Sequence, residues 1–212
     1  MLHEDLEIFI CQPTRSDAKM LLVSLTGGFI TILIIASSLG TALGESVIAV
    51  IPVGEFPQAL AFNPSNNYIY VANRDSGTVS VIDSTNNTVI KNITVGSSPG
   101  PLVFNPSNNY IYVANRDSGT VSVIDSTNNT LLKNVVVGTE PIALEFNPSN
   151  NYIYVANVVS NSVSMIESNN NTVADTVNVS SLPITLEFNP SNDYVYVAGT
   201  LTGTEGLVSI IG

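Results

Sequence analysis

The chain has 212 residues, of which 44% are hydrophobic, and its 17 acidic and 6 basic side chains give a net charge of −11. This charge repels a phosphate backbone, which excludes nucleic acid as a natural partner. The single histidine, His3, and the single cysteine, Cys11, both precede residue 12. Disulfides, thiolate nucleophiles, imidazole bases and His/Cys metal sites are therefore excluded from residues 45–212.

Residues 20–44 form an apolar segment that has no charged side chain, follows Arg15 and Lys19 and ends in small residues. This order is typical of a signal peptide. At about 1.5 Å per residue, the segment is also long enough to cross a hydrocarbon core of about 30 Å as a helical membrane anchor. Either interpretation predicts that residues 45–212 are exported, secreted or held at the cell surface.

Residues 1–19 precede this segment and have two interpretations. They are a short N-terminal tail, or translation starts at Met20 and they are a misassigned start. In both cases, we expect contact with a membrane only through residues 20–44.

Beyond residue 45 the chain is built from a repeat. The string Asn-Pro-Ser-Asn-(Asn/Asp)-Tyr-(Ile/Val)-Tyr occurs four times, at intervals of 42 residues. A period of about 40 to 45 residues that divides into short strands is the pattern of propeller blades. The tyrosines that close the string are Tyr70, Tyr112, Tyr154 and Tyr196.

Each repeat divides into four predicted strands, separated by turns rich in Asn, Ser and Gly. In the second repeat, the first three strands are apolar on nearly both faces, whereas the fourth carries Lys133 and Asn134. Inner strands sandwiched between neighbouring sheets have this pattern. We therefore predict an all-β propeller of four four-stranded blades over residues 45–212. The predicted strands of the second repeat are 101–104, 110–115, 120–124 and 130–137.

The two ends of the repeat region complement each other. Residues 47–53 resemble a fourth strand that precedes the first blade, and the last blade ends with residues 207–211 in place of a fourth strand. Pairing the first strand onto the last blade would clasp the ring and hide two sheet edges. Alternatively, two chains share one eight-blade ring as a homodimer, each first strand clasping the other chain.

The repeats resemble those of the YVTN family of β-propellers, over essentially all of residues 46–212. Tyr-Val-Ala-Asn occurs three times and Tyr-Val-Ala-Gly once, each after a Phe-Asn-Pro string, and Ser-Gly-Thr-Val-Ser-Val-Ile-Asp follows the motif in the first two repeats. Such repeats occur in archaeal surface-layer proteins and in bacterial exported proteins, generally as propellers of about seven blades. The resemblance implies a structural, adhesion or binding scaffold for protein or glycan at the cell surface. The motif asparagines are Asn73, Asn115 and Asn157.

Two of the blades are copies, since residues 62–88 and 104–130 are identical. Identical blades are not tuned for separate steps of one reaction, so we expect a non-enzymatic protein and predict no catalytic, cofactor-binding or metal-binding residue. One alternative is a propeller enzyme, because some propellers with related blades are lactonases or oxidoreductases. Another is a truncated fragment of a larger propeller protein, since four blades is a small number for the family.

Two carboxylates are the candidates for such an enzyme. Glu145 and Glu187 replace Ala61 and Val103 in the strand predicted to line the central channel. They could hold a cation or act as acid and base. Without a histidine or lysine beside them, solvated channel lining is the expected role.

The turns after the second strands carry Arg74-Asp75-Ser-Gly and Arg116-Asp117-Ser-Gly. Their oxygens suit calcium, but Asp-Ser-Gly is also an ordinary hairpin turn, which we favour. The arginines are expected to pair with nearby carboxylates such as Asp75 or Asp117.

Five asparagines begin Asn-x-Ser/Thr sequons without an intervening proline, which predicts glycosylation of an exported chain. Three of them share the turn between third and fourth strands, on the outer rim where a glycan has room. The alternative is that asparagine-rich turns produce sequons by chance. The five are Asn86, Asn92, Asn128, Asn170 and Asn178.

Overall fold

A computed structural model describes residues 46–201 and 205–212. The tail and the apolar helix predicted within residues 1–44 lie outside the described residues. No helix in the described part of the chain is long and apolar enough to span a membrane. Residues 49–212 form one compact unit.

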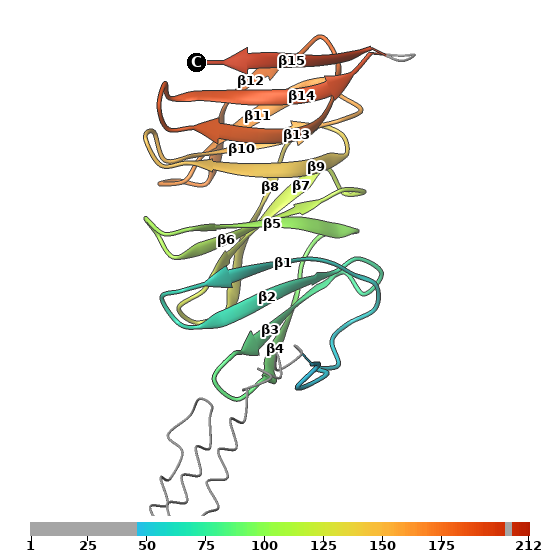
Figure 1. Ribbon diagram of the computed structural model, residues 1–212, viewed down its shortest axis with the longest axis vertical. Coiled ribbons are helices and arrows are strands. Elements are labelled where there is room, and N and C mark those ends of the chain that lie inside the picture. The colour runs from blue at the N-terminus through green and yellow to red at the C-terminus, as the bar shows by residue number, and fades with distance from the viewer. Residues whose placement is uncertain (1–45, 202–204) are drawn as a thin grey trace, which may run out of the picture. The chain divides into compact units, whose positions relative to one another are not determined.

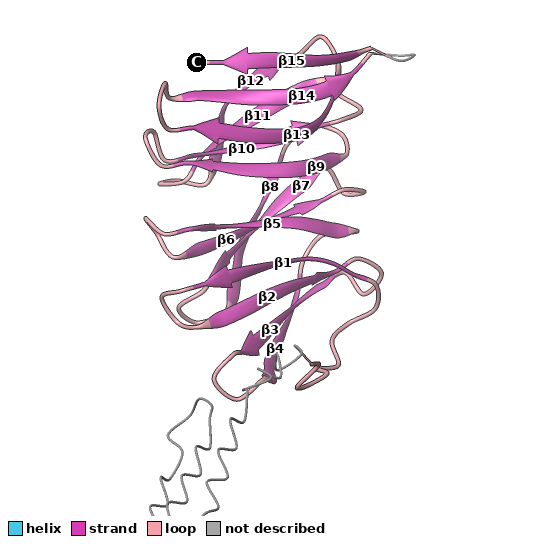
Figure 2. Ribbon diagram, viewed as in Figure 1, coloured by secondary structure: helices cyan, strands magenta, loops and turns pink. Residues whose placement is uncertain are grey.

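The described residues form fifteen strands in four antiparallel sheets, one for each repeat (Figures 1 and 2). Blade 1 consists of β1 (Pro57–Asn63), β2 (Tyr68–Asn73), β3 (Thr78–Asp83) and β4 (Thr88–Thr94). Blade 2 consists of β5 (Pro99–Asn105), β6 (Tyr110–Asn115), β7 (Thr120–Asp125) and β8 (Thr130–Val136). Blade 3 consists of β9 (Pro141–Asn147), β10 (Tyr152–Asn157), β11 (Ser162–Glu167) and β12 (Thr172–Asn178). Blade 4 consists of β13 (Leu182–Asn189), β14 (Tyr194–Thr200) and β15 (Gly206–Ile211).

The repeated Asn-Pro-Ser-Asn-Asn string forms the turn between the first two strands of a blade. In blade 1, Oδ1 of Asn63 accepts a hydrogen bond from the amide of Ser65, and Oδ1 of Asn66 accepts one from the amide of Tyr68. Asn67 has a φ of +59°, the left-handed conformation that asparagine tolerates well. The side chains therefore satisfy the backbone of the turn that sets the register of β1 and β2.

The core lies between blades. The blades stack in chain order (Figure 1), with inner strands β1, β5, β9 and β13 in contact from one blade to the next and outer strands touching only marginally. They therefore converge at their inner edges, as propeller blades do. One cluster joins blade 1 to blade 2 through Tyr70, Val79, Val81, Ile111 and Val113, and equivalent clusters join blades 2 and 3 and blades 3 and 4.

The second tyrosine of the repeat connects neighbouring blades. The hydroxyl of Tyr112 donates to Oδ1 of Asn171 in blade 3 at 2.7 Å, and Nδ2 of Asn108 donates to the carbonyl of Ser168 at 3.1 Å. Burial raises the pKa of Tyr112 to about 12, so its hydroxyl remains a donor. Tyr70 makes the same bond to Asn129 of blade 2. We call this repeated contact the tyrosine latch.

The motif asparagine has a structural role inside each blade. Asn115 is fully buried, and its Nδ2 donates to Oγ of Ser122 at 2.8 Å, while that hydroxyl donates to Oδ1 of Asn134. Asn73 and Asn157 make the equivalent bonds to their serines. The connection from the preceding blade passes so close that a Cβ on Gly96 would lie 2.7 Å from Cγ of Asn115, which accounts for the repeated Val-Gly.

The structure confirms the predicted all-β propeller architecture of four blades and corrects one feature of it. Residues 46–53 contain no strand, and β15 pairs only with β14, so the predicted clasp by residues 47–53 is wrong and blade 4 has three described strands. The physical reason is the stacking order. The chain enters the stack through β1 of blade 1, and β15 of blade 4 lies at the opposite end of the stack (Figure 1).

We predict that Tyr112→Phe lowers the free energy of unfolding by about 1 kcal/mol, because it leaves Oδ1 of the half-buried Asn171 without its donor. The measurement is the midpoint of urea unfolding. Tyr110→Phe on the same strand is the matched control, since it removes a half-buried hydroxyl with no partner among the described residues. Equal midpoints for the two variants would contradict the latch.

Candidate functional site

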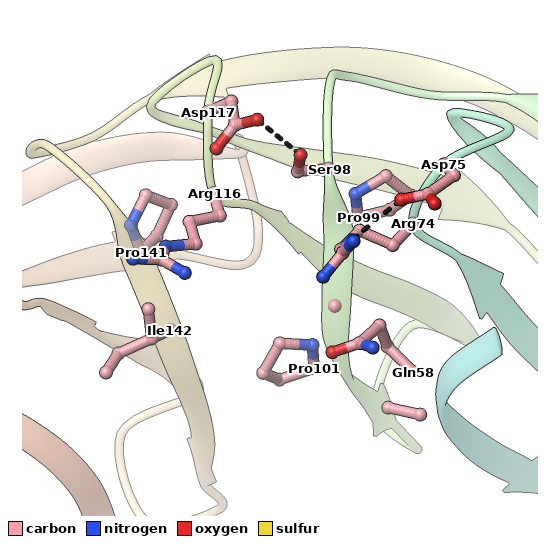
Figure 3. Close-up of a pocket in the computed structure, with 12 residues that line it drawn as sticks. Gln58, Arg74, Asp75, Ser98, Pro99, Pro101, Arg116, Asp117, Pro141 and Ile142 are labelled. Carbon is pink, nitrogen blue, oxygen red and sulfur yellow. Dashed lines mark hydrogen bonds and ion pairs between the residues drawn. The ribbon is translucent and has the colours of Figure 1, made fainter. Parts of the chain in front are cut away.

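A pocket of about 560 Å³ lies where the inner strands of blades 1 to 3 begin (Figure 3). It is bounded by the first residues of β1, β5 and β9 and by the β2–β3 and β6–β7 turns. Three prolines give it a rigid apolar wall, while arginine, carboxylate, amide and hydroxyl groups supply polar atoms. The lining residues are Gln58, Ala59, Arg74, Asp75, Ser98, Pro99, Gly100, Pro101, Arg116, Asp117, Pro141 and Ile142.

The residue before the first proline of β1, β5 and β9 lies beside this pocket in an unusual backbone conformation. Phe56, Ser98 and Glu140 have φ values of 53°, 54° and 55°, a left-handed region that such side chains rarely occupy. Each carbonyl accepts a hydrogen bond from the first residue of the β2–β3 turn or its equivalent, at 2.9–3.0 Å. These bonds hold the strained residue in place and fix the turn beside it.

The two pocket arginines have the same local sequence but different partners. Nε of Arg74 donates to Oδ1 of Asp75 at 2.7 Å, and its guanidinium lies 4.0 Å from the centre of the Phe56 ring. Arg116 instead donates to Oε2 of Glu140 in the next blade, from Nη2 at 2.6 Å and from Nε at 3.0 Å. The difference arises because the copied turns have different neighbours. The turn of Arg74 lies between Phe56 and Ser98, whereas the turn of Arg116 lies between Ser98 and Glu140.

These contacts agree with the sequence predictions in part. Arg74 pairs with Asp75 as expected, but Arg116 pairs with Glu140, and Asp117 accepts a hydrogen bond from Ser98. Gly77 and Gly119 have φ values of 61° and 60°, so the Asp-Ser-Gly strings form hairpin turns. Within residues 46–201 and 205–212, no group of three or more His, Cys, Asp or Glu side chains could hold a metal ion.

Sequence analysis missed the residues that organise the pocket: Phe56, Ser98 and Glu140. A signal for them exists, because the position before the repeated proline varies within otherwise copied repeats. Its meaning depends on the left-handed backbone and on contacts to a neighbouring blade, neither of which a single repeat reveals.

The two candidate carboxylates lie on adjacent inner strands, β9 and β13, outside the lining of this pocket. Glu145 is half-buried opposite Tyr154, and Glu187 is exposed opposite Tyr196. Burial, with a smaller contribution from the charge of Glu187, raises the pKa of Glu145 to about 7. Glu145 is therefore a titrating group at neutral pH. Channel lining by Glu145 and Glu187, and the alternative of a catalytic pair, both stay predictions.

All five predicted glycosylation sites have exposed side chains. Asn86, Asn128 and Asn170 lie in the turns between third and fourth strands, as predicted, and Oδ1 of Asn86 accepts a hydrogen bond from Oγ1 of Thr88. Asn92 and Asn178 lie on outer strands β4 and β12. The use of these sequons stays a prediction.

Comparison with protein-family models assigns the chain to a family. The family described as cytochrome D1 heme domain matches residues 63–204, which is most of the propeller. The chain belongs to this family. No curated protein matches the chain.

Among solved structures, the chain is similar to Kuenenia stuttgartiensis hydrazine synthase (21% identity, TM-score 0.70, covering 76% of this chain and 47% of that chain). It is also similar to the dihydro-heme d1 dehydrogenase NirN in complex with DHE (15% identity, TM-score 0.64, covering 76% of this chain and 36% of that chain). A third similar structure is the WD40 β-propeller domain of Doa1 (15% identity, TM-score 0.54, covering 65% of this chain and 45% of that chain). At these identities the likeness establishes the fold, and this chain spans about half or less of each structure.

The family name implies a heme, but the residues that line the pocket do not fit a ligated heme iron. Iron in heme proteins takes axial ligands from His, Cys, Met or Tyr. The described residues contain no His or Cys, Met165 is buried in the cluster between blades 3 and 4, and the hydroxyls of Tyr70 and Tyr112 are held in latches. None of these residue types lines the pocket, and both of its arginines are paired with carboxylates.

We predict that hemin added to the His3→Ala/Cys11→Ser variant shows no shift of the Soret band of the kind that axial ligation of the iron produces. The reason is that no His, Cys, Met or Tyr side chain lines the pocket. A visible absorption titration measures this. A saturable one-to-one spectral change that Arg116→Ala abolishes would contradict the misfit.

We predict that raising the pH from 5 to 8 lowers the melting temperature. The pKa of Glu145 in the fold, about 7, lies above its unfolded value, about 4.3. Its stabilising contribution is therefore full below pH 4 and is lost as the pH rises through 7. In Glu145→Gln this dependence should largely disappear, whereas the exposed control Glu205→Gln should keep it. A pH dependence unchanged in Glu145→Gln would overturn the assignment.

Proposed function

We propose that this chain is a non-enzymatic binding scaffold at the cell surface and that its pocket binds neutral glycan chains. The observation that carries the proposal is the pairing of both arginines of the pocket. Arg74 pairs with Asp75 and Arg116 with Glu140, so neither arginine is a free cation that would select an anion. The carboxylate of Asp117 accepts a hydrogen bond from Ser98. The pocket offers guanidinium and amide donors beside carboxylate and amide acceptors, and a neutral ligand with many hydroxyl groups can bind to both kinds.

The size and stiffness of the pocket support a carbohydrate rather than a flat protein surface. Its volume of about 560 Å³ lies in the range of small-ligand sites, roughly 300–1,000 Å³. Pro99, Pro101 and Pro141 form a rigid apolar wall, and Gln58 adds an amide that can both donate and accept (Figure 3). Rigid walls reduce the entropy lost when a ligand binds.

Location at the surface rests on the sequence. The apolar residues 20–44 supply an export signal or an anchor, the YVTN-like repeats resemble those of surface-layer proteins, and the five exposed sequons suit a glycoprotein. Scaffold use is favoured over catalysis because the copied turns of blades 1 and 2 place the same groups twice around one pocket.

Binding to an array of immobilised neutral and acidic oligosaccharides tests the proposal. We expect neutral oligosaccharides to bind, and Arg74→Ala/Arg116→Ala to weaken binding at least tenfold, since each hydrogen bond to a charged group contributes about 1.5–3 kcal/mol. The matched control is Lys91→Ala/Lys133→Ala, which removes the same charge from outer strands β4 and β8. The control should bind as the unaltered chain does.

Three results would count against this function: no binding to any oligosaccharide, preference for the acidic ones, or equal losses in both double variants. Thermal unfolding of each variant shows that a loss of binding is not a loss of fold.

A further inference from the structure

Blades 1 and 4 each expose one face to solvent. The equivalent faces of blades 2 and 3 are covered by a neighbouring blade. On blade 1, Leu60 and Phe62 are 69% and 51% exposed. At the equivalent positions of blade 4, Leu186 and Phe188 are 6% and 9% exposed, because they pack against blade 3. The exposed face of blade 1 therefore carries the same side chains with which blade 4 packs against the blade before it.

The outer face of blade 4 shows the opposite half of the same interface. Val208 and Ile210 of β15 are 62% and 58% exposed. Their register against Ala198 and Tyr196 matches that of Val79 and Val81 against Ala72 and Tyr70 in blade 1. There Val79 and Val81 are fully buried, because blade 2 covers them.

Both halves of the tyrosine latch are also present at these ends. Blade 4 holds the donor half, in which Nδ2 of Asn192 donates to the Tyr196 hydroxyl at 2.9 Å, as Asn108 does to Tyr112. Blade 1 holds the acceptor half in Ser84 and Asn87. Oγ of Ser84 donates to the carbonyl of Asn67 as Ser126 does to that of Asn109, and the φ of Asn87, 58°, matches the 57° of Asn129.

From these matched faces we infer that two copies of this chain bind each other head to tail, blade 4 of each against blade 1 of the other, and close an eight-blade ring. Continuity with the three interfaces inside the chain identifies the occupant. Leu60 and Phe62 of one copy cover Val208 and Ile210 of the other, and Tyr196 of one donates to Asn87 of the other. The proposed interface has the apolar contacts found between successive blades of one chain, and the tyrosine latch found between blades 1 and 2 and between blades 2 and 3.

Closure after two copies follows from the shape of the stack. The inner strands contact one another while the outer strands barely touch, so successive blades rotate about one axis. The part of this chain that superposes on a WD40 β-propeller domain, 65% of its length, covers 45% of that chain, so the blades follow the curvature of a propeller ring. Eight blades lie within the usual range of propellers, and a head-to-tail contact forms a closed ring when the rotation is complete.

Native mass spectrometry of the full-length chain in mild detergent tests this inference. We expect twice the mass of one chain, and a single-chain mass for Phe62→Glu and for Val208→Lys, each of which places a charge in the interface. The matched control is Val136→Glu, on outer strand β8 and 74% exposed, which should stay a dimer.

Mixing Phe62→Glu with Val208→Lys gives the sharpest result. A mixed ring contains one unaltered interface and one in which Glu faces Lys, so the mixture should recover dimers of one copy each. A single-chain mass for the unaltered protein, assemblies larger than two copies, or dimers that survive Phe62→Glu would each overturn the shared ring. This outcome is independent of glycan binding, because neither substitution touches the pocket.

Discussion

Apolar side chains on both faces of each inner sheet are the constraint on which this structure depends. Neighbouring residues of a strand point to opposite faces, so Ile111 and Tyr112 cannot both be buried by a single partner sheet. Both are fully buried because blade 1 covers one face of blade 2 and blade 3 covers the other. The apolar faces of the inner blades therefore need a neighbour on each side, and the tyrosine latch adds a polar contact between blades 1 and 2 and between blades 2 and 3.

The pocket is a consequence of this packing. Convergence of the inner strands brings the segment before β1, two blade-to-blade connections and two hairpin turns to one place, where an identical Arg-Asp-Ser-Gly turn meets a different neighbour each time. Arg74 lies over Phe56 while Arg116 binds Glu140, so a duplicated sequence yields two different sets of contacts around one pocket. Variation at one position per repeat is thus enough to give a copied scaffold its own binding chemistry.

Sequence periodicity predicts what is local and misses what depends on neighbouring blades. The strand over residues 110–115 and the positive φ of Gly77 follow from composition and turn chemistry. The partner of Arg116 lies 24 residues away in another blade, and the raised pKa of Glu145 depends on burial by tertiary packing. The predicted clasp by residues 47–53 failed because β propensity indicates a strand and not where in space its partner lies.

The central claim is that a blade face needs a covering blade, and hydrogen–deuterium exchange at two protein concentrations tests it most directly. The account predicts that amides of β14 and β15 exchange more slowly when the chain is concentrated than when it is diluted, because blade 3 covers one face of blade 4 and only pairing of two copies covers the other. Amides of β6, covered on both faces within one chain, should exchange slowly at both concentrations. Exchange in β15 that is independent of concentration would contradict the account.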